Sequence, residues 1–152
     1  MAEEENTGEG YLNAKSWYEK SLKLREENYE FSSCYESRRD VSIICDCIAG
    51  IYSKLKDAES FEKRQYFYTR YYELALQNYR ENPCFESIRS VAISCDRLGD
   101  TAKIKGNAEG YAEAEKWYAE ELKYNSTSHY RPVCFIDKRA DKIGGKISDI
   151  KV

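Results

Sequence analysis

Apolar residues recur along this chain at spacings of three and four residues, and short polar breaks separate one run from the next. Between residues 36 and 56 they form a broad stripe made by Val41, Ile44, Cys45, Ile48, Ile51, Tyr52 and Leu55. The next run carries Phe61, Tyr68, Tyr72, Leu74, Ala75 and Tyr79. Because these spacings match the turn of an α-helix, both runs predict amphipathic helices.

Polar residues mark where these helices begin and end. Thr7, Asp57 and Asn107 have side chains that cap helix N-termini, and each is followed two residues later by an acid that complements the helix dipole. Pro83 cannot continue a helix, and it biases the residue before it away from helical geometry. The pattern predicts six helices in antiparallel succession, over residues 9–31, 36–56, 58–81, 86–106, 108–125 and 135–150.

The same unit repeats at a spacing of fifty residues. Four sets of identical residues show it: Cys34, Cys84 and Cys134; Arg39, Arg89 and Arg139; Tyr18, Tyr68 and Tyr118; Glu9, Glu59 and Glu109. A fixed period predicts a stacked array, in which each unit buries its apolar face against its neighbours. We therefore expect an all-α fold with a single repeat domain over residues 8–152, preceded by an acidic tail over residues 1–7.

One copy of the unit carries a pattern of small and aromatic residues. Asp96-Arg97-Leu98-Gly99-Asp100-Thr101-Ala102 is followed by Gly106-Asn107 and then by Ala114-x-x-Trp117-Tyr118-x-x-Glu121-Leu122. This order resembles the tetratricopeptide repeat family, and the resemblance extends from Gly8 to about Asp149. It implies antiparallel helical hairpins stacked as a right-handed superhelix, with Gly99 and Ala49 where two helices of a hairpin approach closely. The space between hairpins is then filled by Tyr18, Tyr68 and Tyr118.

The chain also departs from that family. Its fifty-residue period exceeds the family's standard of about 34 residues, so both helices of a unit must be longer. Arg64 stands where the other copies have Ala14 and Ala114. The last predicted helix matches the others only after one residue is dropped, as expected of a terminal helix that caps the array.

Composition narrows the function classes. Charged residues make up 34% and aromatic residues 14% of the chain. This aromatic content is too high for a disordered protein. Acids and bases are interleaved at a net charge of −3, so no basic face is expected to bind a nucleic acid. No apolar run is long enough to span a membrane, and residues 1–6 are acidic where a secretory signal would be basic and then apolar. We expect a cytoplasmic, bacterial protein whose partner is neither nucleic acid nor membrane.

The six cysteines raise two alternatives, a disulfide framework and a metal site. Repeat-equivalent positions in stacked helices lie on the order of 10 Å apart, which is beyond disulfide reach. Cys45-x-Cys47 lies within a predicted helix, and no second Cys pair or His cluster completes a zinc site. We therefore predict no metal. The repeat-equivalent cysteines are predicted to be reduced, mostly buried core thiols: Cys34, Cys45, Cys84, Cys95 and Cys134.

The chain offers little for catalysis. His129 is the sole histidine, and its repeat equivalents Tyr29 and Tyr79 identify an aromatic packing position. A base without a positioned nucleophile is not a catalytic device. Gly144-Gly145 lacks the following Lys-Ser or Lys-Thr of a phosphate-binding loop. We expect no enzyme activity and no cofactor.

A polar stripe repeats on the first helix of each predicted hairpin. One copy is Arg39, Ile43, Asp46, Gly50 and Ser53, and the next is Arg89, Ile93, Asp96, Asp100 and Lys103. By the family resemblance this stripe faces a concave groove, so we predict that the partner is bound by Arg39, Asp46, Ser53, Arg89, Asp96, Asp100 and Lys103. Relatives that hold a peptide's terminal carboxylate use Lys and Asn here, and the aspartates depart from that pattern. The alternative is that these residues form surface ion pairs between neighbouring helices, each worth at most ~1 kcal/mol.

The most direct interpretation is a non-catalytic interaction module that binds an extended protein or peptide segment in its groove. The alternative is a peptide-sensing regulatory domain whose effector part lies elsewhere. The chain could also self-associate through its terminal helices, because the end units of such an array lack a neighbour on one side.

Overall fold

The computed structural model describes residues 8–125 apart from residue 56, and this part of the chain is all-helical. Its five helices, with no strand among the described residues, are α1 (Gly8–Phe31), α2 (Tyr35–Tyr52), α3 (Ala58–Glu81), α4 (Phe85–Lys103) and α5 (Ala108–Asn125). The predicted all-α class and five of the six predicted helices are confirmed. The sixth helix, predicted over 135–150, and the acidic tail over 1–7 lie outside the described residues.

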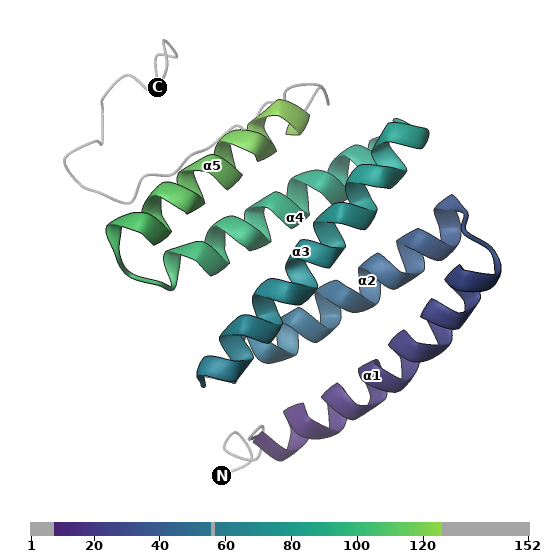
Figure 1. Ribbon diagram of the computed structural model, residues 1–152, viewed down its shortest axis with the longest axis horizontal. Coiled ribbons are helices and arrows are strands. Elements are labelled where there is room, and N and C mark those ends of the chain that lie inside the picture. Colours follow the sequence, from purple (N-terminus) through teal and green to yellow (C-terminus); the bar gives the residue numbers. More distant parts are fainter. Residues whose placement is uncertain (1–7, 56, 126–152) are drawn as a thin grey trace, which may run out of the picture.

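Each helix packs against the next one along the chain (Figure 1). Alternate helices also meet through side chains. On one side, α1 meets α3 through an ion pair between Glu26 and Arg70, with 2.5 Å between the charged atoms. On the other side, α2 meets α4, where the Tyr35 hydroxyl lies 3.7 Å from the Cys84 sulfur. α1 and α2 are thus each held both by the next helix along the chain and by the helix after it.

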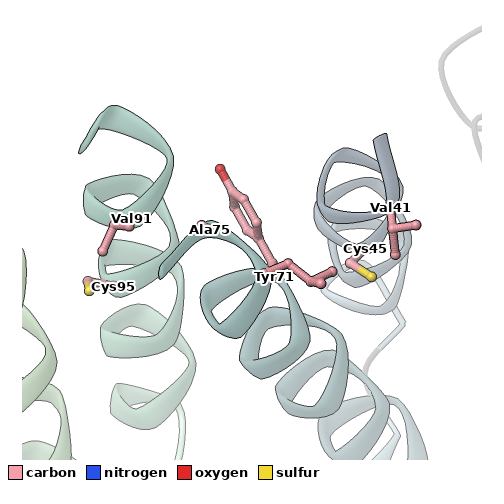
Figure 2. Close-up of a cluster of buried hydrophobic side chains, with 7 residues drawn as sticks. Val41, Cys45, Tyr71, Ala75, Val91 and Cys95 are labelled. Atoms are coloured by element: carbon pink, nitrogen blue, oxygen red, sulfur yellow. The ribbon is translucent and has the colours of Figure 1, made fainter. Parts of the chain in front are cut away.

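The largest buried cluster lies where three helices meet (Figure 2). It takes Val41 and Cys45 from α2, Tyr71, Leu74 and Ala75 from α3, and Val91 and Cys95 from α4. Two smaller clusters flank it, one around Ile48 and one joining Ala49, Tyr68 and Leu98. The core is therefore a series of seams between neighbouring helices, and α3 contributes to the largest of them.

The predicted N-caps are confirmed where the structure describes them. The Asp57 carboxylate accepts a hydrogen bond of 2.8 Å from the Ser60 backbone N–H at the start of α3. The Asn107 side-chain oxygen accepts one of 2.8 Å from the Gly110 N–H at the start of α5. Each side chain satisfies an N–H group that has no partner within its helix. Thr7 lies outside the described residues.

Two helices end earlier than predicted. α2 stops at Tyr52 and α4 at Lys103, where the sequence pattern predicted ends at residues 56 and 106. The chain after each helix tightens into backbone bonds of the i to i−3 type, such as Lys54 N–H to Ile51 carbonyl at 2.9 Å. In the α4–α5 connection Gly106 then adopts φ of 65°, a left-handed conformation that favours glycine.

The small residues lie where helices approach closely, as the family resemblance implied. A Cβ atom on Gly99 would lie only 2.4 Å from a ring carbon of Tyr118, so α4 and α5 meet there without room for a methyl group. Ala49 is fully buried beside Tyr68 at the equivalent place in α2 and α3. Arg64, which replaces alanine in this copy, places its guanidinium 5.6 Å from the centre of the Tyr68 ring.

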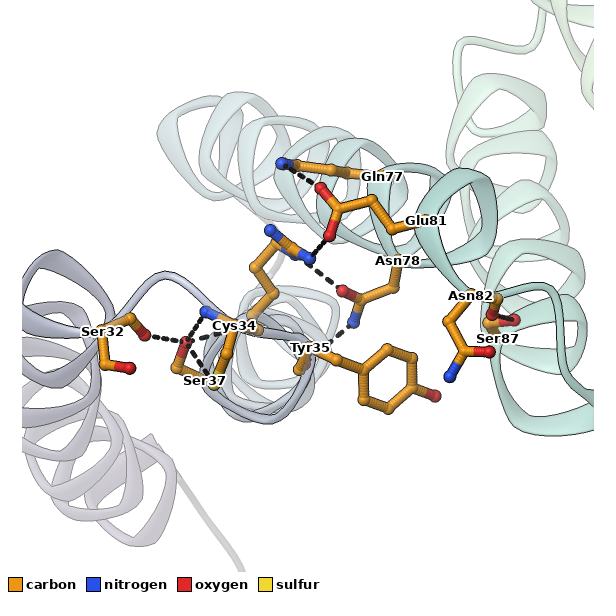
Figure 3. Close-up of polar contacts among 10 residues, drawn as sticks. Ser32, Cys34, Tyr35, Ser37, Gln77, Asn78, Glu81, Asn82 and Ser87 are labelled. Atoms are coloured by element: carbon orange, nitrogen blue, oxygen red, sulfur yellow. Dashed lines mark hydrogen bonds and ion pairs between the residues drawn. The ribbon is translucent and has the colours of Figure 1, made fainter.

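The prediction that all repeat-equivalent cysteines are core residues is wrong for Cys34 and Cys84, which are the half-buried N-cap residues of α2 and α4. The backbone N–H of each donates to the hydroxyl of the serine three residues on, over 3.0 Å to Ser37 and 2.9 Å to Ser87. Each serine hydroxyl in turn donates to a carbonyl before the helix, and Ser37 reaches that of Ser32 at 2.6 Å (Figure 3). The two cysteines therefore lie at helix starts, where the Ser37 and Ser87 hydroxyls make the hydrogen bonds.

Cys45 and Cys95 are buried, as predicted, and all five described cysteines are free thiols; Cys134 lies outside the described residues. Burial raises the pKa of Cys45 and of Cys95 to about 12. By contrast, hydrogen bonds from Ser37 and Ser87 lower the pKa of Cys34 and of Cys84. The thiolate is the reactive form, so the two pairs should differ in reactivity.

We expect a maleimide reagent at neutral pH to label Cys34 and Cys84 of the native protein quickly, and Cys45 and Cys95 only after denaturant is added. Peptide mapping by mass spectrometry at successive times reports each site separately. Cys34→Ser and Cys84→Ser should each remove one fast site and leave the slow sites unchanged. Fast native labelling of Cys45 or Cys95 would contradict their place in the core.

Candidate partner-binding face

The predicted binding residues lie on one side of α2 and α4, which we call the α2–α4 face. It consists of Arg39, Asp46, Ser53, Arg89, Asp96, Asp100 and Lys103. Both arginines, Asp100 and Lys103 are exposed, while Asp46, Ser53 and Asp96 are half-buried. The residues share a side because each helix repeats them at spacings of three and four.

On α2, this face is turned toward α4. Arg39 Nε lies 4.0 Å from Glu86 Oε2, and Asp46 Oδ1 lies 3.5 Å from Arg97 Nε. Burial raises the pKa of Asp46, and Arg97 opposes that shift by favouring the charged carboxylate. Ion pairing between neighbouring helices, the alternative considered from the sequence, therefore does occur at Arg39 and Asp46.

On α4, the equivalent residues form no such ion pairs among the described residues. Arg89, Asp96 and Asp100 make no ion pair within the described part of the chain. Asp96 and Asp100 stand one helical turn apart. Burial and then the charge of Asp100 raise the pKa of Asp96, and the charges of Arg97 and Lys103 offset part of that shift. Two carboxylates placed side by side repel each other, so this end of the face favours a cationic group.

α5 supports the α4 part of the face. The Tyr118 hydroxyl donates a hydrogen bond of 2.7 Å to Asp100 Oδ1, and the Lys103 amino group lies 5.8 Å from the centre of the same ring. Burial, and then the Asp100 hydrogen bond, raise the pKa of Tyr118. Asp100 is thereby held in one orientation, and its Oδ2 has no hydrogen bond within residues 8–125.

Ser53 contributes least to the face. Its hydroxyl donates a 2.6 Å hydrogen bond to the Gly50 carbonyl and its backbone caps the end of α2. Sequence reasoning also missed Glu86 and Arg97, which complete the pairs with Arg39 and Asp46. Arg97 had no repeat signal, because its equivalent one copy earlier is Cys47.

Other kinds of site find little support within residues 8–125. No group of three or more His, Cys, Asp or Glu side chains there is placed to hold a metal ion. A shallow, open hollow lies along α3, lined by Glu62, Gln65, Tyr66, Thr69, Arg70 and Glu73. His129 lies outside the described residues. None of the described helices is both long and apolar enough to cross a bilayer.

Comparison with protein-family models, with curated proteins and with solved structures gives no match for this chain. A proposal for its function therefore rests on the arrangement of its helices and on the chemistry of the α2–α4 face.

Proposed function

We propose that this chain is a non-catalytic interaction module, a tetratricopeptide-like array stacked as a right-handed superhelix, which binds an extended protein or peptide segment on the α2–α4 face. The helices pack in succession, and alternate helices touch on both sides. This is the arrangement expected when fifty-residue copies stack. In such an array, a ligand that runs across α2 and α4 would meet the equivalent face of each helix.

The observation that carries the proposal is the group of charges on α4 without ion-pair partners among the described residues. Asp96 is partly desolvated beside Asp100, and Arg89 stands on the same stripe two turns earlier. A partner segment that brings a Lys or Arg side chain to the aspartates would relieve their repulsion. Arg89 has donors for a carbonyl or carboxylate of that segment. The preferred ligand is therefore a segment that carries both positively and negatively charged side chains.

Free thiols at all five described cysteines fit a reducing compartment, so we place the proposed module in the cytoplasm.

Arg39→Ala combined with Arg89→Ala tests the proposal. A library of extended peptides of mixed charge is screened first, and the affinity of the best binder is then measured by calorimetry. Each lost charge-assisted hydrogen bond costs about 1.5–3 kcal/mol, so the double variant should bind at least about ten-fold more weakly. Its thermal midpoint should hardly change, because Arg39 makes one exposed ion pair and Arg89 none among the described residues.

Lys63→Ala combined with Arg80→Ala is the matched control, since it removes two exposed positive charges from α3, away from the α2–α4 face. This control should bind the peptide with unchanged affinity. If the arginine variant instead loses several kcal/mol of stability and keeps its affinity, the arginines hold α2 to α4 and the binding surface lies elsewhere. A loss of affinity in both variants would indicate a general charge effect.

A further inference from the structure

α1 exposes a line of large apolar side chains. Trp17, Leu24 and Phe31 have 71%, 67% and 92% of their surface exposed. They follow one another at intervals of seven residues, which places them on one face of the helix. We call these three residues the α1 stripe. Scattered apolar residues on a surface are common, but an aligned set on one helix face is typical of an interface.

The repeat shows what this position does elsewhere in the chain. Leu74 of α3, the equivalent of Leu24, is buried in the largest core cluster. Trp117 of α5, the equivalent of Trp17, packs edge-on against Tyr72 with ring centres 5.1 Å apart. In α3 and α5 this face therefore packs against neighbouring helices of the array. By contrast, α1 lies at the edge of the described array (Figure 1).

The last residue of the stripe departs from the repeat in an informative way. Phe31 is equivalent to Glu81, an exposed residue on α3. The stripe is therefore more apolar than packing inside the array requires, and it gains its extra aromatic ring at the most exposed position. This extension makes the three residues symmetric about Leu24, with one aromatic side chain seven residues to either side.

We propose that two copies of this chain form a two-fold symmetric dimer, in which the α1 helices pack antiparallel through the α1 stripe. Antiparallel pairing puts Leu24 of both copies at the symmetry axis and Trp17 of one copy against Phe31 of the other. A two-fold interface needs a surface that is complementary to itself, and a stripe symmetric about its central residue meets that requirement.

The charges beside the stripe favour the same orientation. Lys20 and Glu27 are exposed, lie on one flank of the stripe, and make no ion pair within the described residues. Lys20 Nζ lies 4.9 Å from the centre of the Trp17 ring, at the edge of the stripe. In the antiparallel pair, Lys20 of each copy faces Glu27 of the other, which forms two ion pairs. A parallel two-fold pair would put this flank of the two helices on opposite sides of the interface, where Lys20 and Glu27 form no such pairs.

The size of the stripe sets the expected affinity. Large aromatic side chains bury about 150–250 Å² each, so three large residues per copy give less than the roughly 800 Å² per partner of a standard interface. We therefore expect a dimer that dissociates in the micromolar range. Sedimentation equilibrium over a range of micromolar concentrations should show the mass rising from one chain to two and no further.

Leu24→Glu is the decisive variant. It sets two carboxylates against each other at the symmetry axis, so the protein should remain monomeric at every concentration. Leu12→Glu is the matched control, because Leu12 is also exposed on α1, at 55%, but lies on a different side of the helix. The control should dimerise as the unchanged protein does, and circular dichroism should show both variants equally folded.

Charge exchange tests the orientation. Lys20→Glu alone or Glu27→Lys alone should raise the dissociation constant about ten-fold, since each change replaces two attractive pairs with two repulsive ones. Both changes together should restore dimerisation in the antiparallel arrangement. The proposal is overturned by a monomer at all concentrations, by a mass that grows beyond two chains, or by a dimer that withstands Leu24→Glu.

Discussion

Replacing Arg38 with alanine should lower the free energy of unfolding by about 3 kcal/mol. Arg38 is only 3% exposed, and its Nε donates a hydrogen bond of 2.7 Å to the Asn78 side-chain oxygen. Its guanidinium also pairs with Glu81, and the Asn78 amide donates over 3.2 Å to the Tyr35 carbonyl (Figure 3). Truncation would leave the buried Asn78 oxygen without its donor and open a cavity between α2 and α3.

Arg39→Ala is the matched control for this prediction. The neighbouring arginine is exposed and, within residues 8–125, makes a single ion pair at 4.0 Å, so its removal should cost less than about 1 kcal/mol. Chemical denaturation of both variants gives the two free energies. Equal losses would mean that the buried network between α2 and α3 contributes no more than a surface pair.

Gly99→Ala should lower the free energy of unfolding by about 2 kcal/mol. The new methyl group would stand 2.4 Å from Tyr118 Cε1, and the ring is held by the hydrogen bond from its hydroxyl to Asp100. The helices must then separate or the ring must leave its position. This cost exceeds the gain of up to about 1 kcal/mol that alanine brings over glycine within a helix.

Gly50→Ala provides the comparison, because it makes the same change inside α2 with no atom within 4 Å of the new methyl group. Here only helix propensity acts, and stability should rise by roughly 0.5–1 kcal/mol. Thermal and denaturant unfolding of both variants measure the difference. Gain of stability in both would show that α4 and α5 can separate at Gly99 without cost.

The helices were predictable because their signal is local. Apolar spacing identified all five described helices, and the caps at Asp57 and Asn107 fixed two of their starts. The exact ends of α2 and α4 were not predictable. They depend on whether the last backbone N–H groups donate to the carbonyl four residues back or to the one three residues back. The family resemblance implied the close approach at Gly99, but it assigned Tyr118 to the space between hairpins, and the structure places that ring against Gly99 within the α4–α5 pair.

The roles of individual polar residues were harder to predict. Arg38 is buried because Asn78, forty residues away in the sequence, can accept its hydrogen bond, and no local pattern reveals that. The repeat does hold a signal, because the next copy has Ile88 at the same position. The repeat predicts core positions for Cys34 and Cys84, yet the serine three residues after each resembles the second half of a capping box.

A chain of near-copies risks assembling in the wrong order, because one helix can replace its equivalent fifty residues away. The Arg38–Asn78 bond distinguishes one pair of helices from the other, since Ile88 takes the place of Arg38 in α4. If α2 packed against α5 instead of α3, Arg38 would be buried without Asn78, at a cost of several kcal/mol. The buried Arg38 thus makes the pairing of α2 with α3 more stable than a pairing of α2 with α5.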